Sequence, residues 1–136
     1  MKILIDPNVI IDYLADRTPF ADHAERVLAL CGNGKVTGLV TANAITDICY
    51  VLCKLAGREK TLEAIRTLCA VLDITDLVKA DILNAMELDM HDYEDALAAQ
   101  CAKRIKAEYI VTRNCSDYAN SPVHAIEPSA FLTQFQ

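Results

Sequence analysis

Three aspartates of this sequence occupy positions from which a side chain reaches a binding site. Asp6 directly follows the apolar run 2–5, and Asp117 lies just beyond a second apolar run at 109–112. Asp95 stands near the start of an alanine-rich segment. Ligands of open α/β sheets bind beyond the carboxyl ends of the strands, so acids gathered at that edge would hold a metal ion. Oxygen ligands without sulfur or imidazole favour Mg²⁺ or Mn²⁺ over zinc.

Alternating strands and helices are needed to bring these acids together. The hydrophobic pattern predicts strands at residues 2–6, 35–40, 71–74, 109–112 and 123–126. It predicts helices at residues 7–15, 20–31, 42–56, 59–70, 77–88, 92–106 and 128–135, with start signals at Asp6, Thr18, Thr41, Asp76 and Asp92. Such alternation is typical of an α/β domain with a mainly parallel sheet flanked by helices. Right-handed crossovers put the carboxyl ends of its strands on one edge.

The composition fits a single compact domain over residues 1–136 and limits what the chain binds. The sequence is 53% hydrophobic, and no apolar run reaches the roughly 18 residues that span a bilayer, so we expect a cytoplasmic protein without membrane contact. The formal net charge of -6 disfavours a module that grips nucleic acid through a broad basic surface. This charge does not exclude a nuclease, because bound divalent cations reverse the local potential where the substrate binds.

The six cysteines form no Cys-x-x-Cys pair and fall mostly on the apolar faces of predicted helices; they are Cys31, Cys49, Cys53, Cys69, Cys101 and Cys115. We therefore expect reduced core residues. Cys49 and Cys53 are one helical turn apart, but no histidine or second cysteine pair at suitable spacing completes a zinc site.

Each candidate acid also has a purely structural interpretation. Asp6 is a good helix N-cap, and Asp92 with Asp95 resembles a capping box. Asp47 lies on the polar flank of its helix, and Asp117 lies in a loop where aspartates commonly form turns. Capping explains Asp95 less well than Asp92, because Asp95 heads a row of alanines suited to close packing on the sheet. An inward carboxylate at that position needs a cation or hydrogen-bond donors.

Four segments, taken in order, resemble the PIN-domain ribonucleases, in particular the small VapC-like toxins. The segments are KILIDPNVIIDYL, TANAITDICYVLCK, DYEDALAAQCA and YIVTRNCSDY, and RTPF and SPVHAIEPSAFL add to the likeness. The resemblance covers nearly the whole chain. It implies a three-layer fold in which a five-stranded, mainly parallel sheet lies between helices, with the acids at its carboxyl edge.

The resemblance also implies an Mg²⁺- or Mn²⁺-dependent endoribonuclease. Matched motif by motif, the family's catalytic acids fall on Asp6, Asp47, Asp95 and Asp117. The metal ligands expected from this match are Asp6, Asp95, Asp117 and the neighbouring Asp92. The residues expected to position water or phosphate are Asn8, Thr112 and Asn114. Two ions about 4 Å apart would activate a water and stabilise the leaving oxygen of an RNA phosphodiester.

Two positions depart from the family pattern. Pro7 stands where a hydroxyl residue is usual, and Asp47 stands where glutamate is frequent. A second hypothesis is therefore a PIN-like domain with weakened catalysis that acts as an RNA- or protein-interaction module. A third is a phosphotransfer domain with Asp6 as the acyl-phosphate acceptor. The sequence lacks the aspartate two residues later that haloacid-dehalogenase-like proteins have.

The family likeness implies partners as well. It implies a small antitoxin protein that occludes the acidic site, and a homodimer. RNA contacts are expected from basic side chains, namely Arg17, Lys54, Arg58, Lys60 and Arg113.

Overall fold

Five parallel strands form one sheet in the order β3-β2-β1-β4-β5. The computed structural model describes residues 1–136. The strands are β1 (Lys2–Ile5), β2 (Thr37–Thr41), β3 (Asp73–Thr75), β4 (Tyr109–Val111) and β5 (Ala125–Ile126). Every pairing is parallel, so the carboxyl ends of all five strands lie along one edge. The predicted α/β class and the five-stranded parallel sheet are confirmed.

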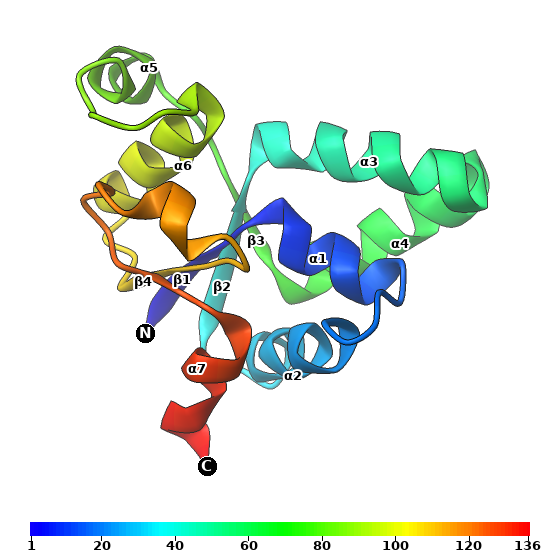
Figure 1. Cartoon of the computed structure of the whole chain (residues 1–136). Helices are drawn as coiled ribbons and strands as arrows, with labels where there is room; N and C mark the ends of the chain where they lie inside the picture. The colour runs from blue at the N-terminus through cyan, green and yellow to red at the C-terminus, as the bar shows by residue number, and fades with distance from the viewer.

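Helices cover both faces of this sheet. They are α1 (Pro7–Leu14), α2 (Ala21–Gly32), α3 (Ala42–Ala56), α4 (Arg58–Val71), α5 (Lys79–Ala85), α6 (Tyr93–Arg104) and α7 (Pro128–Leu132), with short 3-10 helices η1 (Cys115–Tyr118) and η2 (Thr133–Phe135). Figure 1 shows α5 and α6 on one side of the sheet and α1 to α4 on the other. The three predicted layers are therefore present. None of the helices combines the length and the hydrophobicity needed to cross a membrane.

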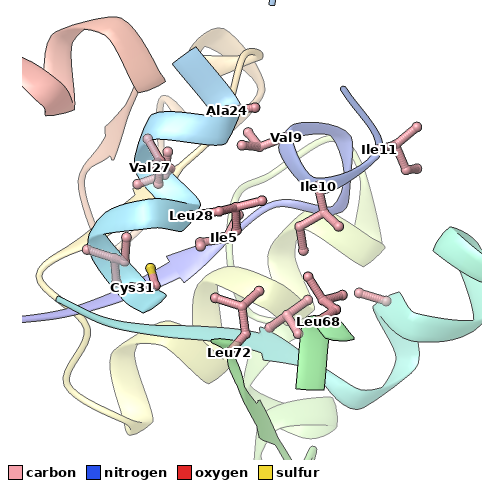
Figure 2. Close-up of a cluster of buried hydrophobic side chains, with 14 of the residues drawn as sticks. Ile5, Val9, Ile10, Ile11, Ala24, Val27, Leu28, Cys31, Leu68 and Leu72 are labelled. Carbon is pink, nitrogen blue, oxygen red and sulfur yellow. The ribbon is translucent and has the colours of Figure 1, made fainter. Parts of the chain in front are cut away.

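Two clusters of buried apolar side chains hold the layers together. Ile3 and Ile5 of β1 point into the larger cluster, which joins α1, α2, α3 and α4 (Figure 2). Leu4 points to the opposite face, where it packs with Ala99 and Ala102 of α6. Successive side chains of a strand alternate between faces, so this one short strand anchors both layers.

Gly38 in β2 is required by close packing. A Cβ atom at this position would lie 2.5 Å from the Cys31 sulfur and 2.7 Å from Cδ2 of Leu72. Both of these side chains belong to the cluster in Figure 2. A larger residue at position 38 would separate α2 from the sheet.

Most predicted elements begin and end within three residues of their predicted limits, and α5 shows a clear error. The prediction that Asp76 caps this helix is wrong, because Val78 is the N-cap and the helix starts at Lys79. The carboxylate that accepts the Val78 N–H belongs to Asp81, at an N–O distance of 3.1 Å. Asp76 instead offers its backbone carbonyl to Arg104, at 2.6 Å. Thr41 precedes α3 as predicted but makes no side-chain capping bond.

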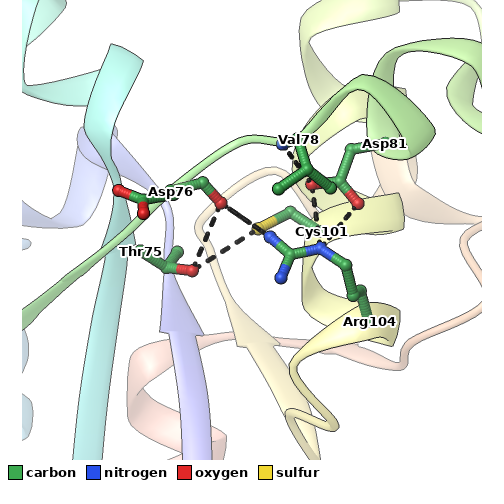
Figure 3. Close-up of polar contacts among 6 residues, drawn as sticks. All are labelled: Thr75, Asp76, Val78, Asp81, Cys101 and Arg104. Carbon is green, nitrogen blue, oxygen red and sulfur yellow. Dashed lines mark hydrogen bonds and ion pairs between the residues drawn. The ribbon is translucent and has the colours of Figure 1, made fainter.

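Two fully buried carboxylates are paired with arginines of the same chain. Asp81, which is 1% exposed, accepts hydrogen bonds from Nε of Arg104 at 2.9 and 3.0 Å (Figure 3). Asp12, also 1% exposed, accepts bonds from Nε and Nη2 of Arg113, and Nη1 of Arg17 lies 3.9 Å from it. Both acids therefore have an internal cation.

The cysteines are all free thiols, as predicted, but they are less uniformly buried than expected. Cys31 and Cys101 are buried, whereas Cys69 is exposed. Cys49, Cys53 and Cys115 are half-buried. The expectation of core positions therefore holds for two of the six.

Candidate functional site

Asp6 lies where β1 ends and α1 begins. Its Oδ1 accepts the Asn8 N–H at 3.1 Å, so it caps the helix, with Pro7 in the first turn. Its Oδ2 accepts the Thr112 hydroxyl at 3.0 Å from the end of β4. Burial raises the pKa of Asp6, and the hydrogen bonds from Asn8, Thr112 and Tyr118 oppose that rise. The carboxylate is thus fixed at the carboxyl ends of the neighbouring strands β1 and β4.

Asp95 lies in the first turn of α6. Its backbone N–H donates to Oδ1 of Asp92, the N-cap, at 3.0 Å, so the cap and the candidate acid are separate residues. Burial raises the pKa of Asp95 from 3.8 to about 6, and the negative charges of Asp92, Asp6 and Asp117 add to the rise. A carboxyl group whose pKa is raised by neighbouring negative charges would be stabilised in its ionised form by a bound cation.

Tyr118 connects these two acids. Its hydroxyl lies 3.2 Å from Oδ2 of Asp6 and 3.2 Å from Oδ1 of Asp95. Burial and the two neighbouring carboxylates raise the pKa of Tyr118, so the phenol keeps its proton and acts as the donor. A phenol has one proton and can donate fully to only one of the two oxygens. The facing acids are therefore incompletely satisfied.

The acids border a small polar cleft of about 120 Å³. The lining residues are Asp6, Pro7, Thr41, Asn43, Ala44, Asp47, Glu94, Asp95, Ala98 and Tyr118. Asp47 of α3 faces Glu94 of α6 across it, and the charge of Asp47 is the main cause that raises the pKa of Glu94. Oδ1 of Asn43 is buried and has no hydrogen-bond partner. The cleft thus combines oxygen atoms from three helices and two strand ends.

The remaining predicted site residues lie around this cleft. Asp92 and Asp117 are exposed and are not among its lining residues, although both charges act on Asp95. Thr112 is fully buried and accepts the Asn114 N–H at 3.1 Å. Oδ1 of Asn8 is buried without a partner. The structure therefore brings together Asp6, Asp47 and Asp95, with Asp92 and Asp117 at the periphery.

Two of the basic residues proposed to contact RNA have another partner. Arg113 is bound to the buried Asp12 and stacks over the Phe20 ring, with its guanidinium 4.1 Å from the ring centroid. Arg17 is the second cation near Asp12. These contacts fix the loop after β4, which carries Thr112 and Asn114.

Sequence reasoning assigned no role to Glu94 and Tyr118. Glu94 directly precedes Asp95, and at the second position of α6 its side chain also reaches the cleft. Tyr118 was part of the segment YIVTRNCSDY, but a tyrosine after a loop aspartate is equally compatible with packing. The feature that could have indicated a role for Tyr118 is its position shortly after a strand end. A tyrosine buried there needs a polar partner for its hydroxyl.

The donor set at this cleft fits a hard divalent cation. The candidate ligands are carboxylate and amide oxygens, and no sulfur or imidazole lines the cleft. Asp6 and Asp95 form no ion pair with a basic side chain, and the buried Asn43 oxygen has no partner. No three acidic, histidine or cysteine side chains already converge as ligands of one ion. The facing oxygens of Asp6 and Asp95 meet at the Tyr118 hydroxyl instead.

Comparison with known proteins identifies relatives of the same fold. The chain is 28% identical over 123 residues to "Ribonuclease VapC1" of Aquifex aeolicus, which covers 87% of this chain and 85% of that protein. The structure of VapBC2 from Rickettsia felis bound to a promoter DNA fragment superposes with a TM-score of 0.75, at 17% identity, over 93% of this chain and 98% of that one. VapC20 of Mycobacterium tuberculosis, described as a Sarcin-Ricin loop cleaving toxin, gives a TM-score of 0.65 at 14% identity, over 79% and 86% of the two chains. Residues 2–116 match the PIN domain profile, so this chain belongs to the PIN domain family.

Proposed function

We propose that this protein is an Mg²⁺- or Mn²⁺-dependent endoribonuclease and the toxin of a toxin–antitoxin pair. Support comes from its similarity to a protein named ribonuclease and from the acid pair at the sheet edge. The single observation that carries the proposal is that Asp6 and Asp95 meet at one hydroxyl without any basic partner. Two such carboxylates need a positive charge, and the chain supplies only that of Arg113, which acts on Asp6 without forming an ion pair with it.

The proposed ligands follow from position. Asp6 and Asp95 would hold a cation in common, Asp47 would contribute from α3, and Asp117 and Asp92 would contribute directly or through water. When bound, a divalent cation supplies Lewis acidity, which lowers the pKa of a coordinated water and stabilises negative charge on phosphate oxygens. Glu94 faces Asp47 across the cleft and is a further candidate ligand.

Other residues would orient the acids and the substrate. Thr112 and Tyr118 donate to Oδ2 of Asp6, and Tyr118 also reaches Asp95, so both hydroxyls limit the carboxylate rotamers. The free oxygens of Asn8 and Asn43 are available to accept a bond from a water. Asn114 is exposed beside Thr112, where its amide is available to a phosphate oxygen.

Thermal unfolding with and without metal tests the site directly. We expect Mg²⁺ or Mn²⁺ at about 100 times its dissociation constant to add about 2.7 kcal/mol of stability, which raises Tm by several degrees. Asp6→Asn should remove most of this increase. Asp22→Asn, which changes an exposed acid on α2, should keep it. The absence of a metal-dependent shift in the wild-type protein would rule out the proposed site.

The alternative function is a PIN-like interaction module with weakened catalysis. Pro7 lines the cleft and provides neither a hydroxyl nor an N–H there, which favours this alternative. The two functions differ in one measurement, because only the enzyme gives metal-dependent RNA cleavage that is lost with Asp95→Asn.

An antitoxin partner is proposed from the relatives and from one surface. Toxin–antitoxin complexes are among the structural neighbours. An apolar groove between α1, α2 and α4 suits an amphipathic segment of such a partner. Its lining includes Tyr13, Leu14, Leu28, Leu68 and Val71. We propose that the antitoxin docks in this groove.

A homodimer is proposed from a different face. Exposed apolar side chains are concentrated at α5 and its C-cap, where Ile82, Leu83 and Met86 are 43%, 51% and 63% exposed. A patch of this kind on a small protein is favourable for self-association.

A further inference from the structure

Two cysteines of α3 lie side by side on the outside of the molecule. The sulfur atoms of Cys49 and Cys53 are 3.7 Å apart, and both residues are half-buried. They line an open hollow together with Thr46, Tyr50 and Lys54. The pair is therefore accessible in a way that Cys31 and Cys101 are not.

The distance between the two sulfurs matches a metal-binding geometry. In a tetrahedral thiolate site with metal–sulfur bonds of about 2.3 Å, neighbouring sulfurs are about 3.8 Å apart. The observed 3.7 Å equals that edge within a tenth of an ångström. One turn of regular helix thus presents two adjacent ligands at the required separation, without a change of the backbone.

The thiol pair is separate from the acidic cleft. Asp47 lines the cleft and Cys49 does not, although they are two positions apart on α3. Residues two positions apart on a helix point about 200° from one another, so they face opposite directions. The two places also differ in chemistry, because carboxylates prefer hard cations and thiolates prefer soft ones.

We propose that Cys49 and Cys53 bind a thiophilic divalent cation, of the class of Zn²⁺ and Cd²⁺, as two adjacent ligands of a tetrahedral site. Binding forms two metal–sulfur bonds and releases two thiol protons to solvent, so charge and atoms balance without an oxidant. Two basic residues, Lys54 and Arg58, lie close to the pair in sequence.

The two remaining positions of the site are open to solvent or to a second copy of the chain. A two-fold axis through the ion would bring the same pair from another chain and complete a four-cysteine site. Tyr50, which is 65% exposed and lines the same hollow, is available for contact in such an assembly. Water ligands would complete the site in a monomer.

Titration of the reduced, metal-free protein with Cd²⁺, in buffer containing excess Mg²⁺, tests the proposal. Mg²⁺ occupies oxygen sites, so the thiolate-to-metal absorption in the ultraviolet reports only on the cysteines. We expect saturable binding whose affinity falls at least about 100-fold in Cys49→Ser and in Cys53→Ser. Loss of a residue that only supports a ligand typically costs about 10- to 100-fold, so loss of a ligand itself should cost more. Cys69→Ser, which changes the exposed cysteine of α4, is the matched control and should bind as the wild type does.

The stoichiometry and the mass in solution identify the other ligands. One ion per chain at constant mass assigns the open positions to water, whereas one ion per two chains with a doubled mass assigns them to a second copy. Both results support the site. Absence of saturable absorption in the wild type, or its persistence in the Cys49→Ser/Cys53→Ser double variant, overturns it. Unfolding curves of the metal-free variants show whether each retains the fold.

Discussion

Asp12 and Asp81 are neutralised by arginines of the chain, whereas Asp6 and Asp95 at the sheet edge are not. Asp81 is bound by Arg104 on the α5–α6 side of the sheet (Figure 3), and Asp12 by Arg113. Asp6 and Asp95 have only hydroxyl and backbone N–H donors. The contrast is not a matter of burial alone, because Asp6 is also largely enclosed.

The difference distinguishes structural acids from the proposed metal ligands. A buried carboxylate with a fixed guanidinium has its charge compensated at all times and rigidifies its surroundings. A pair of carboxylates that share one phenol proton stays electrostatically unfavourable until a cation arrives. This chain has thirteen basic residues, yet none forms an ion pair with Asp6 or Asp95. We therefore expect opposite effects. Substitution of an unpaired acid should reduce RNA cleavage without lowering stability, whereas disruption of a buried ion pair should lower stability.

The largest expected effect is loss of RNA cleavage in Asp95→Asn. The amide removes a negative ligand at the centre of the cleft, so the rate should fall about 100- to 1000-fold, the scale for removal of a major electrostatic contributor. Stability of the metal-free protein should not fall, because a source of repulsion is removed. Cleavage of a structured RNA with added Mn²⁺ measures the first effect and urea unfolding the second. Asp22→Asn is the control, and equal cleavage by Asp95→Asn would contradict the assignment.

Arg104→Met should instead lower the free energy of unfolding. The substitution leaves the Asp81 carboxylate buried with a single donor, the Val78 N–H. Removing one partner of a buried ion pair costs 3–5 kcal/mol, and the partial exposure of Arg104 lowers the expected loss of unfolding free energy to about 3 kcal/mol. Urea unfolding measures it, and Arg26→Met on the exposed face of α2 should change stability by less than about 0.5 kcal/mol. A loss as small as the control's would remove the distinction between the two kinds of acid.

The sequence predicts the sheet better than it predicts these ion pairs. Alternation of apolar runs and helical stripes identified all five strands and seven helices, because burial imposes those periods locally. The predicted Asp76 cap of α5 is wrong: Arg104, 28 positions further along the chain, binds the Asp76 carbonyl, and the helix begins only after Val78. Such a contact has no local signal. The same holds for Asp12, whose partner is 101 positions away.

The candidate site shows the same difference between residues with a local sequence signal and residues placed by long-range contacts. Asp6, Asp95 and Asp117 are singled out by their strand-end and helix-start positions, and the family resemblance adds Asp47. Tyr118 was not identified, because its hydroxyl meets Asp6 across 112 positions of sequence. Asp92 is a predicted metal ligand and Glu94 has no predicted role, yet Glu94 lines the cleft and Asp92 does not.

Tyr118→Phe should weaken metal binding without removing it. The phenol is buried and orients both acids, and loss of an outer-shell hydrogen bond to a ligand costs about 10-fold or more in metal affinity. Midpoints of Mg²⁺ or Mn²⁺ titrations followed by Tm give the affinity. Tyr13→Phe, which removes a hydroxyl from an exposed position on α1, should leave the midpoint unchanged. Equal or tighter binding by Tyr118→Phe would mean that the phenol competes with the cation.

The smallest expected effect is a pH dependence of stability that belongs to the unpaired acids. The pKa of Asp95 is raised from 3.8 to about 6, so over this window the folded chain holds more protons than the unfolded chain. Stability of the metal-free protein should therefore fall as pH rises from about 4 to about 6, by about 1 kcal/mol once solvent screening of this partly exposed group is included. Urea unfolding in EDTA at the two pH values measures the fall, which Asp95→Asn should reduce by that amount. Saturating Mg²⁺ should reverse the trend, since a ligated carboxylate is deprotonated and metal affinity increases with pH. An identical pH dependence in wild type and Asp95→Asn would mean that Asp95 is not the site of charge repulsion. The contrast between the unpaired acids and the arginine-paired Asp12 and Asp81 would then have no energetic basis.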